Sequence, residues 1–194
     1  MKKMYLCLAL LLVFSCNQVK EVKEVKAETA TEEVQEAIDP NYNPEAKLQE
    51  LGIELSTPSA PVANYVNAVR TGNLIFLAGK GPRKADGENI TGKVGTDLTI
   101  EEGYEAARIT GINQLSVLKA ELGNLNRVKR IIKVKGMVNC GPDFKDQPKV
   151  VNGYSDLMVA VFGDKGKHAR AAVGMGSLPS NIAIEVEMIV EVQD

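Results

Sequence analysis

Tryptophan is absent from this 194-residue sequence, aromatic residues make up only 5% of it, and histidine occurs once. A hydrophobic core must therefore be built mainly from Val, Ile, Leu, Ala and Met. A multi-histidine metal site and a paired-histidine ribonuclease mechanism both need more than one histidine, so neither can form within one chain. We expect no metal site, and we expect His168 to be a solvent-exposed residue.

Cysteine is also scarce, and positive charge is not in excess over negative charge. Of the three cysteines, Cys7 and Cys16 lie near the N-terminus, which leaves only Cys140 for the rest of the chain. An intradomain disulfide and a cysteine-rich zinc site are therefore excluded. The formal net charge is -2. Because binding to nucleic acid requires a basic face, we expect no nucleic-acid partner.

Residues 1 to 15 have the pattern of a secretory signal peptide. Lys2 and Lys3 precede an apolar run from residue 4 to 14, which is shorter than the roughly 20 residues needed to span a bilayer. Val13-Phe14-Ser15-Cys16 then resembles a bacterial lipobox, in which the cysteine receives a diacylglyceryl group. We predict that Cys16 anchors the chain to a bacterial membrane in the cell envelope, on its periplasmic or surface side. Ordinary cleavage beside an incidental cysteine is the alternative.

Residues 16 to 46 are predicted to comprise this lipidated cysteine and a flexible linker. The segment is dominated by Lys, Glu, Val, Ala and Thr, and its apolar residues are too sparse to form a core. About 30 flexible residues would have a root-mean-square reach near 30 Å. This length would hold a domain clear of a membrane surface, although a helix that binds a partner is an alternative.

Residues 47 to 194 show the pattern of one α+β domain. Thr71-Gly72-Asn73 predicts the turn of a β-hairpin, and Thr99 with Glu102 forms a capping box at the start of a helix. We expect strands at 65–69, 74–78, 128–138, 169–175 and 182–192, and helices at 100–122 and 146–162. This order predicts a mixed sheet with two helices on one face.

Two further expectations concern the faces of the sheet. In the strand at 128–138, Ile132, Val134 and Gly136 are predicted to face one way, with Lys133 and Lys135 facing the other. The sheet face without helices would still carry apolar residues, and a homo-oligomer is the simplest way to cover it.

Several motifs in this domain resemble, in the same order, those of the RidA (YjgF-type) imine deaminase family. The resemblance covers roughly residues 47 to 192, and its specificity comes from the number of spaced motifs that agree. The matching motifs are Tyr65-Val66, Ala78-Gly79, Val151-Asn152, His168-Ala169-Arg170-Ala171-Ala172-Val173, Leu178-Pro179 and Ile184-Glu185-Val186-Glu187.

The resemblance implies a chorismate-mutase-like sandwich and a homotrimer with sites in clefts between subunits. It also implies hydrolysis of reactive 2-imino or enamino acids to 2-keto acids and ammonia, without a cofactor. Arg170 would bind the carboxylate of a small ligand through its planar guanidinium, and Glu185 would orient or activate a water molecule. Tyr65, Asn152 and the backbone of Ala172 would contact the ligand.

Four positions depart from the family pattern around Arg170. Lys80 replaces a glutamine, Ala172 a frequent cysteine, Ser177 a common arginine and Ser155 a tyrosine. Lys80 would add a second positive group and favour a more acidic ligand. These departures leave a second function open, namely a non-catalytic module that binds small carboxylates or acts as a stress-linked holdase.

Overall fold

The structure is a computed structural model that describes residues 42–193. The predicted signal peptide, Cys16 and most of the predicted linker lie outside the described residues. The described part contains the helices α1 (Pro44–Glu50), α2 (Ile100–Leu122) and α3 (Gln147–Phe162), and the strands β1 (Ala68–Thr71), β2 (Leu74–Lys80), β3 (Val128–Asn139), β4 (Ala169–Met175) and β5 (Ile184–Val192). Short 3-10 helices lie at Leu125–Arg127, Gly163–Gly166 and Pro179–Asn181.

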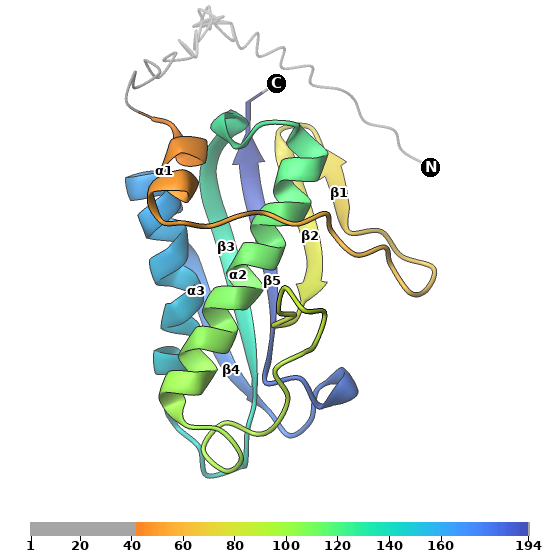
Figure 1. The fold of residues 1–194 in the computed structure, drawn as a ribbon, viewed down its shortest axis with the longest axis vertical. Coiled ribbons are helices and arrows are strands. Elements are labelled where there is room, and N and C mark those ends of the chain that lie inside the picture. Colours follow the sequence, from red (N-terminus) through yellow and green to blue (C-terminus); the bar gives the residue numbers. More distant parts are fainter. Residues whose placement is uncertain (1–41, 194) are drawn as a thin grey trace, which may run out of the picture. The chain divides into compact units, whose positions relative to one another are not determined.

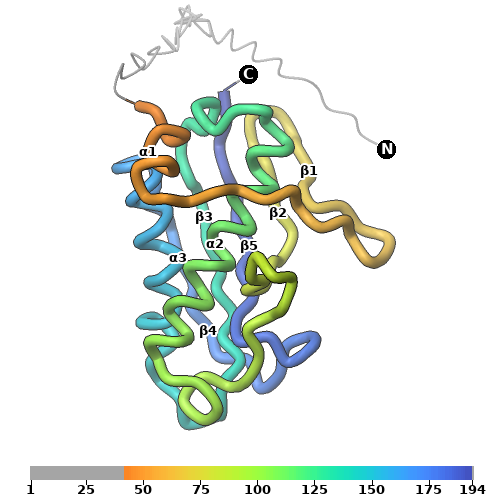
Figure 2. The backbone as a smooth tube through the Cα atoms, viewed as in Figure 1, coloured from red at the N-terminus to blue at the C-terminus, as the bar shows by residue number. Residues whose placement is uncertain are grey.

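The strands form one sheet in the order β1-β2-β5-β3-β4. All neighbouring pairs are antiparallel except β3 and β4, which are parallel because α3 connects them as a crossover. Figure 1 shows α2 and α3 side by side on one face of the sheet, and the path of the chain can be followed in Figure 2. The predicted α+β fold with a mixed sheet is confirmed, and α1 is a third helix that the sequence pattern did not predict.

Local signals place most element boundaries. The side-chain oxygen of Thr99 accepts a hydrogen bond from Glu102 N–H at 3.1 Å, and the carboxylate of Glu102 accepts one from Thr99 N–H at 2.8 Å. These two bonds form the predicted capping box of α2, which ends at Gly123 with φ 73°. In the hairpin, Gly72 has φ 55°, as the turn requires. However, β1 begins at Ala68 rather than residue 65, so the predicted strand start is wrong.

The predicted alternation of the two sheet faces along β3 is partly wrong. Val134 and Gly136 are buried as expected, but Ile131 is the buried residue in place of Ile132. The pairing of β3 with β5 shifts register between Ile131 and Lys133. An irregularity of this kind reverses the faces of the residues before it, and a strict period of two cannot reveal it.

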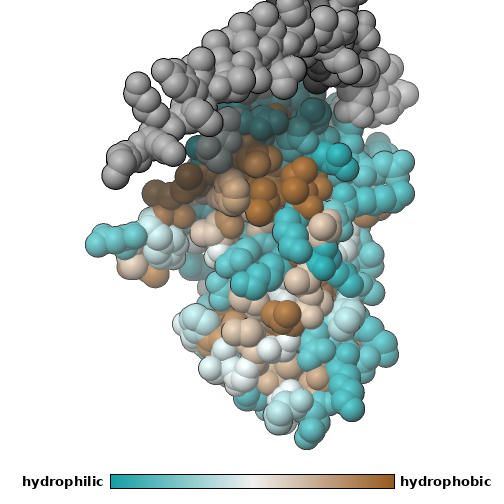
Figure 3. Space-filling model, turned by 180° about the vertical axis from the view of Figure 1, so that it is seen from behind, coloured by the Kyte–Doolittle hydropathy of each residue, from teal (hydrophilic) through white to brown (hydrophobic). Residues whose placement is uncertain are grey.

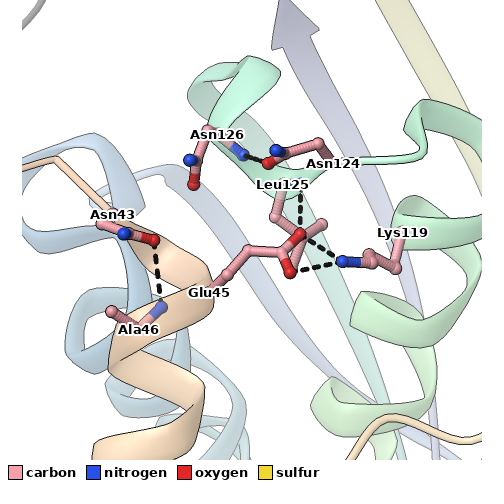
Figure 4. Close-up of polar contacts among 7 residues, drawn as sticks. All are labelled: Asn43, Glu45, Ala46, Lys119, Asn124, Leu125 and Asn126. Carbon is pink, nitrogen blue, oxygen red and sulfur yellow. Dashed lines mark hydrogen bonds and ion pairs between the residues drawn. The ribbon is translucent and has the colours of Figure 1, made fainter.

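The folded part begins earlier than residue 47, because α1 packs on the domain through residues that were assigned to the linker. The Glu45 carboxylate accepts hydrogen bonds from Lys119 Nζ and, at 3.0 Å, from Leu125 N–H (Figure 4). Burial alone would raise the pKa of Glu45, but these bonds outweigh it and hold that pKa below its usual value. The Tyr42 hydroxyl also donates to Val128 O at 2.7 Å.

The face of the sheet that lacks helices carries exposed apolar side chains. Val69 and Phe76 are paired across β1 and β2 and are 56% and 42% exposed. Val173 and Met175, on β4, are also exposed. Figure 3 views the molecule from this side and shows apolar residues gathered there. A homotrimer would cover such a face, and it remains a prediction.

Candidate functional site

Arg170 lies on the edge strand β4, and its side chain is directed toward α3. Its Nη1 donates hydrogen bonds to Asn152 Oδ1 at 2.8 Å and to Ser155 Oγ at 3.1 Å. Asn152 and Ser155 are three positions apart on α3 and therefore share one helix face. The parallel crossover from β3 through α3 to β4 is what brings that face against Arg170.

His168 extends this network at the start of β4. Its Nδ1 lies 2.6 Å from Gly166 O, and its Nε2 lies 3.1 Å from Ser155 Oγ. The carbonyl can only accept, so the hydrogen-bond pattern assigns the proton to Nδ1 and leaves Nε2 to accept from the Ser155 hydroxyl. Burial lowers the pKa of His168, and the nearby charge of Arg170 lowers it further against the opposing effect of the Gly166 bond. The imidazole is therefore neutral at neutral pH. His168 is half-buried, so the prediction that it is solvent-exposed is wrong.

The guanidinium of Arg170 has no negative partner within residues 42–193. Both of its hydrogen bonds come from Nη1 and go to neutral side chains. A guanidinium carries five N–H donors in a fixed plane, so Nη2 and Nε retain donors for a further acceptor. A half-buried arginine held by neutral groups is suited to bind the carboxylate of a ligand, because no internal carboxylate competes for it.

Glu185 lies on the opposite face of the sheet. Its neighbours Ile184 and Val186 are both fully buried against the helices, so the alternation of β5 directs Glu185 the other way. Burial raises the pKa of Glu185, the like charge of Glu187 raises it further, and Lys135 opposes both. Such a carboxylate is a stronger base than an exposed one and can accept a proton from water.

Space for the Glu185 carboxylate comes from a glycine on β2. A Cβ built on Gly79 would lie 2.0 Å from Glu185 Oε1, so any side chain at this position would displace the carboxylate. The pairing of β2 with β5 is irregular between Leu77 and Lys80. Gln114 on α2 stabilises this irregularity by donating to Ala78 O at 3.0 Å and to Val186 O at 2.8 Å.

The predicted site residues therefore separate into groups within one chain. Arg170 and Asn152 are in direct contact, and Ala172 lies two residues further along the same face of β4, partly buried against the core. Glu185 belongs to the other face of the sheet, and β3 lies between its strand and β4. One chain therefore does not bring Arg170 and Glu185 together, and the prediction that sites lie in clefts between subunits stays a prediction.

Lys80 and Tyr65 form a third group. Lys80 pairs with the buried Val186 and therefore faces the side of the helices, where its Nζ donates to Asn67 Oδ1 at 2.6 Å. Together with Tyr65 it lines a groove of about 490 Å³ beside α2. Since β5 and β3 separate β2 from β4, Lys80 does not lie beside Arg170 of the same chain, and its predicted role as a second positive group stays a prediction.

The sequence of residues 45–192 matches the model of the family described as YjgF/chorismate mutase-like, putative endoribonuclease. The chain belongs to this family. Its α+β fold with a mixed five-stranded sheet is the fold of these YjgF-like proteins.

Individual relatives agree with this assignment. The chain is 43% identical over 150 residues to Protein TCP17 of Trypanosoma cruzi, covering 77% of this chain and 94% of the relative. It is 28% identical over 142 residues to a 2-iminobutanoate/2-iminopropanoate deaminase of Dermatophagoides farinae, covering 72% and 95%. Among solved structures, a protein of unknown function from Agrobacterium tumefaciens superposes with a TM-score of 0.71 at 41% identity, covering 77% of this chain and 94% of the other.

Two residues of this YjgF-like chain contribute more to the site than the sequence indicated. Ser155 connects Arg170 to His168, and Gln114 supports the strand irregularity beside Glu185. The spacing of Asn152 and Ser155, three positions apart on one helix, was a signal that could have predicted their shared contact with one partner. For Gln114 the sequence held no signal, because its role depends on two carbonyl groups far away in the chain.

Residues 42–193 contain no group of three or more His, Cys, Asp or Glu side chains arranged to hold a metal ion. Over the same residues, no helix has both the length and the apolar character needed to cross a membrane.

Proposed function

We propose that this domain hydrolyses small 2-imino or enamino acids to 2-keto acids and ammonia. The observation that carries the proposal is the half-buried Arg170, whose contacts in the described chain are all to neutral groups. A charged group that lacks an internal counter-charge is suited to a ligand that brings its own. The 28% identity to a 2-iminobutanoate/2-iminopropanoate deaminase supports an imino acid as that ligand.

The chemistry required of the protein is modest. The free donors of Arg170 would hold the substrate carboxylate, which places the adjacent C=N carbon beside a water molecule. Glu185 would accept a proton as the water oxygen attacks that carbon, and would return it to the nitrogen. Glu185 would then carry the remaining hydroxyl proton to the nitrogen, so that the C–N bond breaks as the C=O bond forms, which yields the 2-keto acid and ammonia. Burial and Glu187 favour this role, because both raise the pKa of Glu185.

A complete site would need a second copy of the chain. Arg170 and Glu185 lie on opposite faces of the sheet, and the face that bears Glu185 also carries exposed Val69, Phe76 and Val173. Packing this apolar face against the β4 edge of a neighbour would bring the Glu185 of one subunit toward the Arg170 of another. A head-to-tail contact of this kind forms a ring where the rotation between subunits closes, and we infer a homotrimer.

The experiment measures keto-acid release from 2-iminopropionate, which an amino-acid oxidase generates in situ from alanine. The purified chain should accelerate release above the spontaneous rate. Arg170→Ala and Glu185→Gln chains should each be inactive alone, but a co-assembled equal mixture should recover about a quarter of wild-type activity, because random mixing gives that share of hybrid sites with both residues. A mixture as inactive as its components would show that the site is not shared between subunits.

The alternative function is a module that binds small carboxylates without turnover. It would be supported if the chain bound pyruvate in an Arg170-dependent manner but left the rate of keto-acid release unchanged. An RNA-cleaving function, as the family description suggests, is less favoured. The chain has a formal charge of -2, and its single His168 is held neutral beside Arg170.

Gly79→Ala should reduce keto-acid release about a hundredfold, which is the lower end of the contribution of a general base. The added methyl group would occupy the position of Glu185 Oε1 and force the carboxylate away. The end of a flexible side chain can move at little cost, so thermal unfolding should change little. Gly141→Ala is the matched control, since its Cβ would meet no atom within 4 Å. Unchanged activity in Gly79→Ala would remove Glu185 from the mechanism.

The proposal also includes a lipid anchor at Cys16, which would place the domain in the cell envelope. It rests on the signal-peptide pattern of residues 1 to 15 and on the lipobox-like sequence that ends in Cys16. Wild-type chain should sediment with the membrane fraction, and Cys16→Ala should move to the soluble fraction. A Cys16→Ala chain that remains with the membranes would exclude lipidation as the cause of attachment.

A further inference from the structure

A polar groove lies on a different edge of the sheet from Arg170. Its walls are the end of β2, the loop that follows it, one face of α2, and the coil at residues 56–59. In Figure 1 this coil (orange) passes in front of α2 after leaving α1. The groove has a volume of about 490 Å³, which is within the range of pockets that bind small molecules.

Positive charge in the groove is not balanced by acidic residues. Lys80, Arg83 and Lys84 line it, and no Asp or Glu is among its lining residues. Lys84 is paired with Asp86 at 3.4 Å outside the groove. Lys80 is bonded only to the neutral Asn67, and within residues 42–193 Arg83 has no ion pair. Two cations therefore share one concavity without a counter-charge, in a chain whose net charge is -2.

Burial of Lys80 makes its positive charge unfavourable when no anion lies beside it. Its ammonium group is half-buried at the end of β2, and burial lowers the pKa of Lys80 below its ordinary value. Removing an ammonium group from water without a negative partner disfavours its charged form. An anion bound beside Lys80 would restore that lost solvation, so the groove favours negatively charged ligands over neutral ones.

Hydrogen bonds hold the walls in place without a ligand. Asn113 Nδ2 on α2 donates to Gly81 O and to Arg83 O, both at 3.0 Å, which fixes the start of the loop. Asn67 Nδ2 donates to Ser59 O at 3.0 Å, which fixes the coil. Since Asn67 also accepts from Lys80, one amide side chain ties the coil to the cation. A pre-formed site of this kind loses little entropy on binding.

The chemistry of the lining residues indicates which anion fits. Besides the cations, the hydroxyl-bearing residues Ser56, Thr57 and Ser59 line the groove, whose surface is more polar than apolar. A phosphate ester carries close to two negative charges at neutral pH and three strong acceptor oxygens, which match two cations and several hydroxyl donors.

We propose that this groove is a binding site for a small phosphate monoester, with Lys80 and Arg83 on the phosphate. Within one chain, β5 and β3 lie between this groove and Arg170, and Lys80 faces the helices whereas Glu185 faces the other side of the sheet. A phosphorylated metabolite bound there would be a second ligand of this protein.

Calorimetric titration of the full chain with glycerol 3-phosphate tests the proposal. Binding should saturate and should weaken about tenfold or more in Lys80→Gln and in Arg83→Gln, as expected for loss of one charge-assisted bond. Lys145→Gln and Arg130→Gln remove exposed cations elsewhere and should change the affinity less than twofold. Glycerol, which lacks the phosphate, should not bind.

Backbone amide NMR shifts of the wild-type chain give a reading that does not depend on how the variants fold. Glycerol 3-phosphate should shift the amides of Lys80, Gly81 and Gly87, which border the groove. The proposal is overturned if no saturable binding occurs up to about 10 mM glycerol 3-phosphate. It is also overturned if Arg170→Ala abolishes binding, because the phosphate would then occupy the site of Arg170. A failed imine assay leaves the result of this titration unaffected.

Discussion

Arg170→Ala should lower the rate of keto-acid release from 2-iminopropionate about a hundredfold. The substitution removes the only described group placed to hold the substrate carboxylate, and a charge-assisted hydrogen bond of this kind is worth about 1.5–3 kcal/mol. Because about 1.4 kcal/mol changes a rate tenfold, two such bonds account for a loss of this size. Arg170→Lys keeps the charge but loses the planar fork, and we expect an intermediate loss of about tenfold.

The decisive control is a substrate that lacks the carboxylate. A neutral imine should be hydrolysed at the same slow rate by wild-type chain and by Arg170→Ala, because neither can use the guanidinium to position it. Arg130→Ala, which removes an exposed arginine from β3, should leave the rate on 2-iminopropionate unchanged. If Arg170→Ala retained full activity on 2-iminopropionate, the assignment of Arg170 as the carboxylate-binding residue would be wrong.

Gly153→Ala should destabilise the domain by about 3 kcal/mol, the upper end of the typical range for overpacking. Helix propensity alone predicts the opposite sign, because alanine is favoured over glycine within a helix by about 1 kcal/mol. At Gly153, however, the new Cβ would lie 2.0 Å from the backbone oxygen of Tyr104 on α2. A backbone atom cannot turn aside like a side chain, so α2 and α3 would have to move apart and lose core contacts.

Urea denaturation followed by circular dichroism measures this effect as a fall in the unfolding midpoint. Gly141→Ala lies outside the helices, and its Cβ would have no neighbour within 4 Å. It should leave the midpoint nearly unchanged. A midpoint that rises in Gly153→Ala would mean that helix propensity outweighs the contact, and that α2 and α3 are not in close backbone contact at this position.

Elements with local causes were predictable from the sequence. The capping box at Thr99 and Glu102 determines where α2 begins, and both of its hydrogen bonds join residues three positions apart. Elements with non-local causes were predicted less well. The early start of the folded part depends on Glu45, whose partners Lys119 and Leu125 are more than 70 residues away in the chain. No pattern around residue 45 contains that information.

The same distinction between local and non-local causes applies to the candidate site. The spaced motifs around Arg170 and Glu185 were enough to assign the family and to select both residues, because side-chain chemistry and order along the chain are properties of the sequence. Which residues meet was decided by tertiary structure. The α3 crossover places Asn152 and Ser155 against Arg170, while the alternation of β5 directs Glu185 to the other face of the sheet. Strand order and sheet face depend on how distant segments pair, so only the folded chain could show that Arg170 and Glu185 lie apart and that Lys80 belongs to a separate groove.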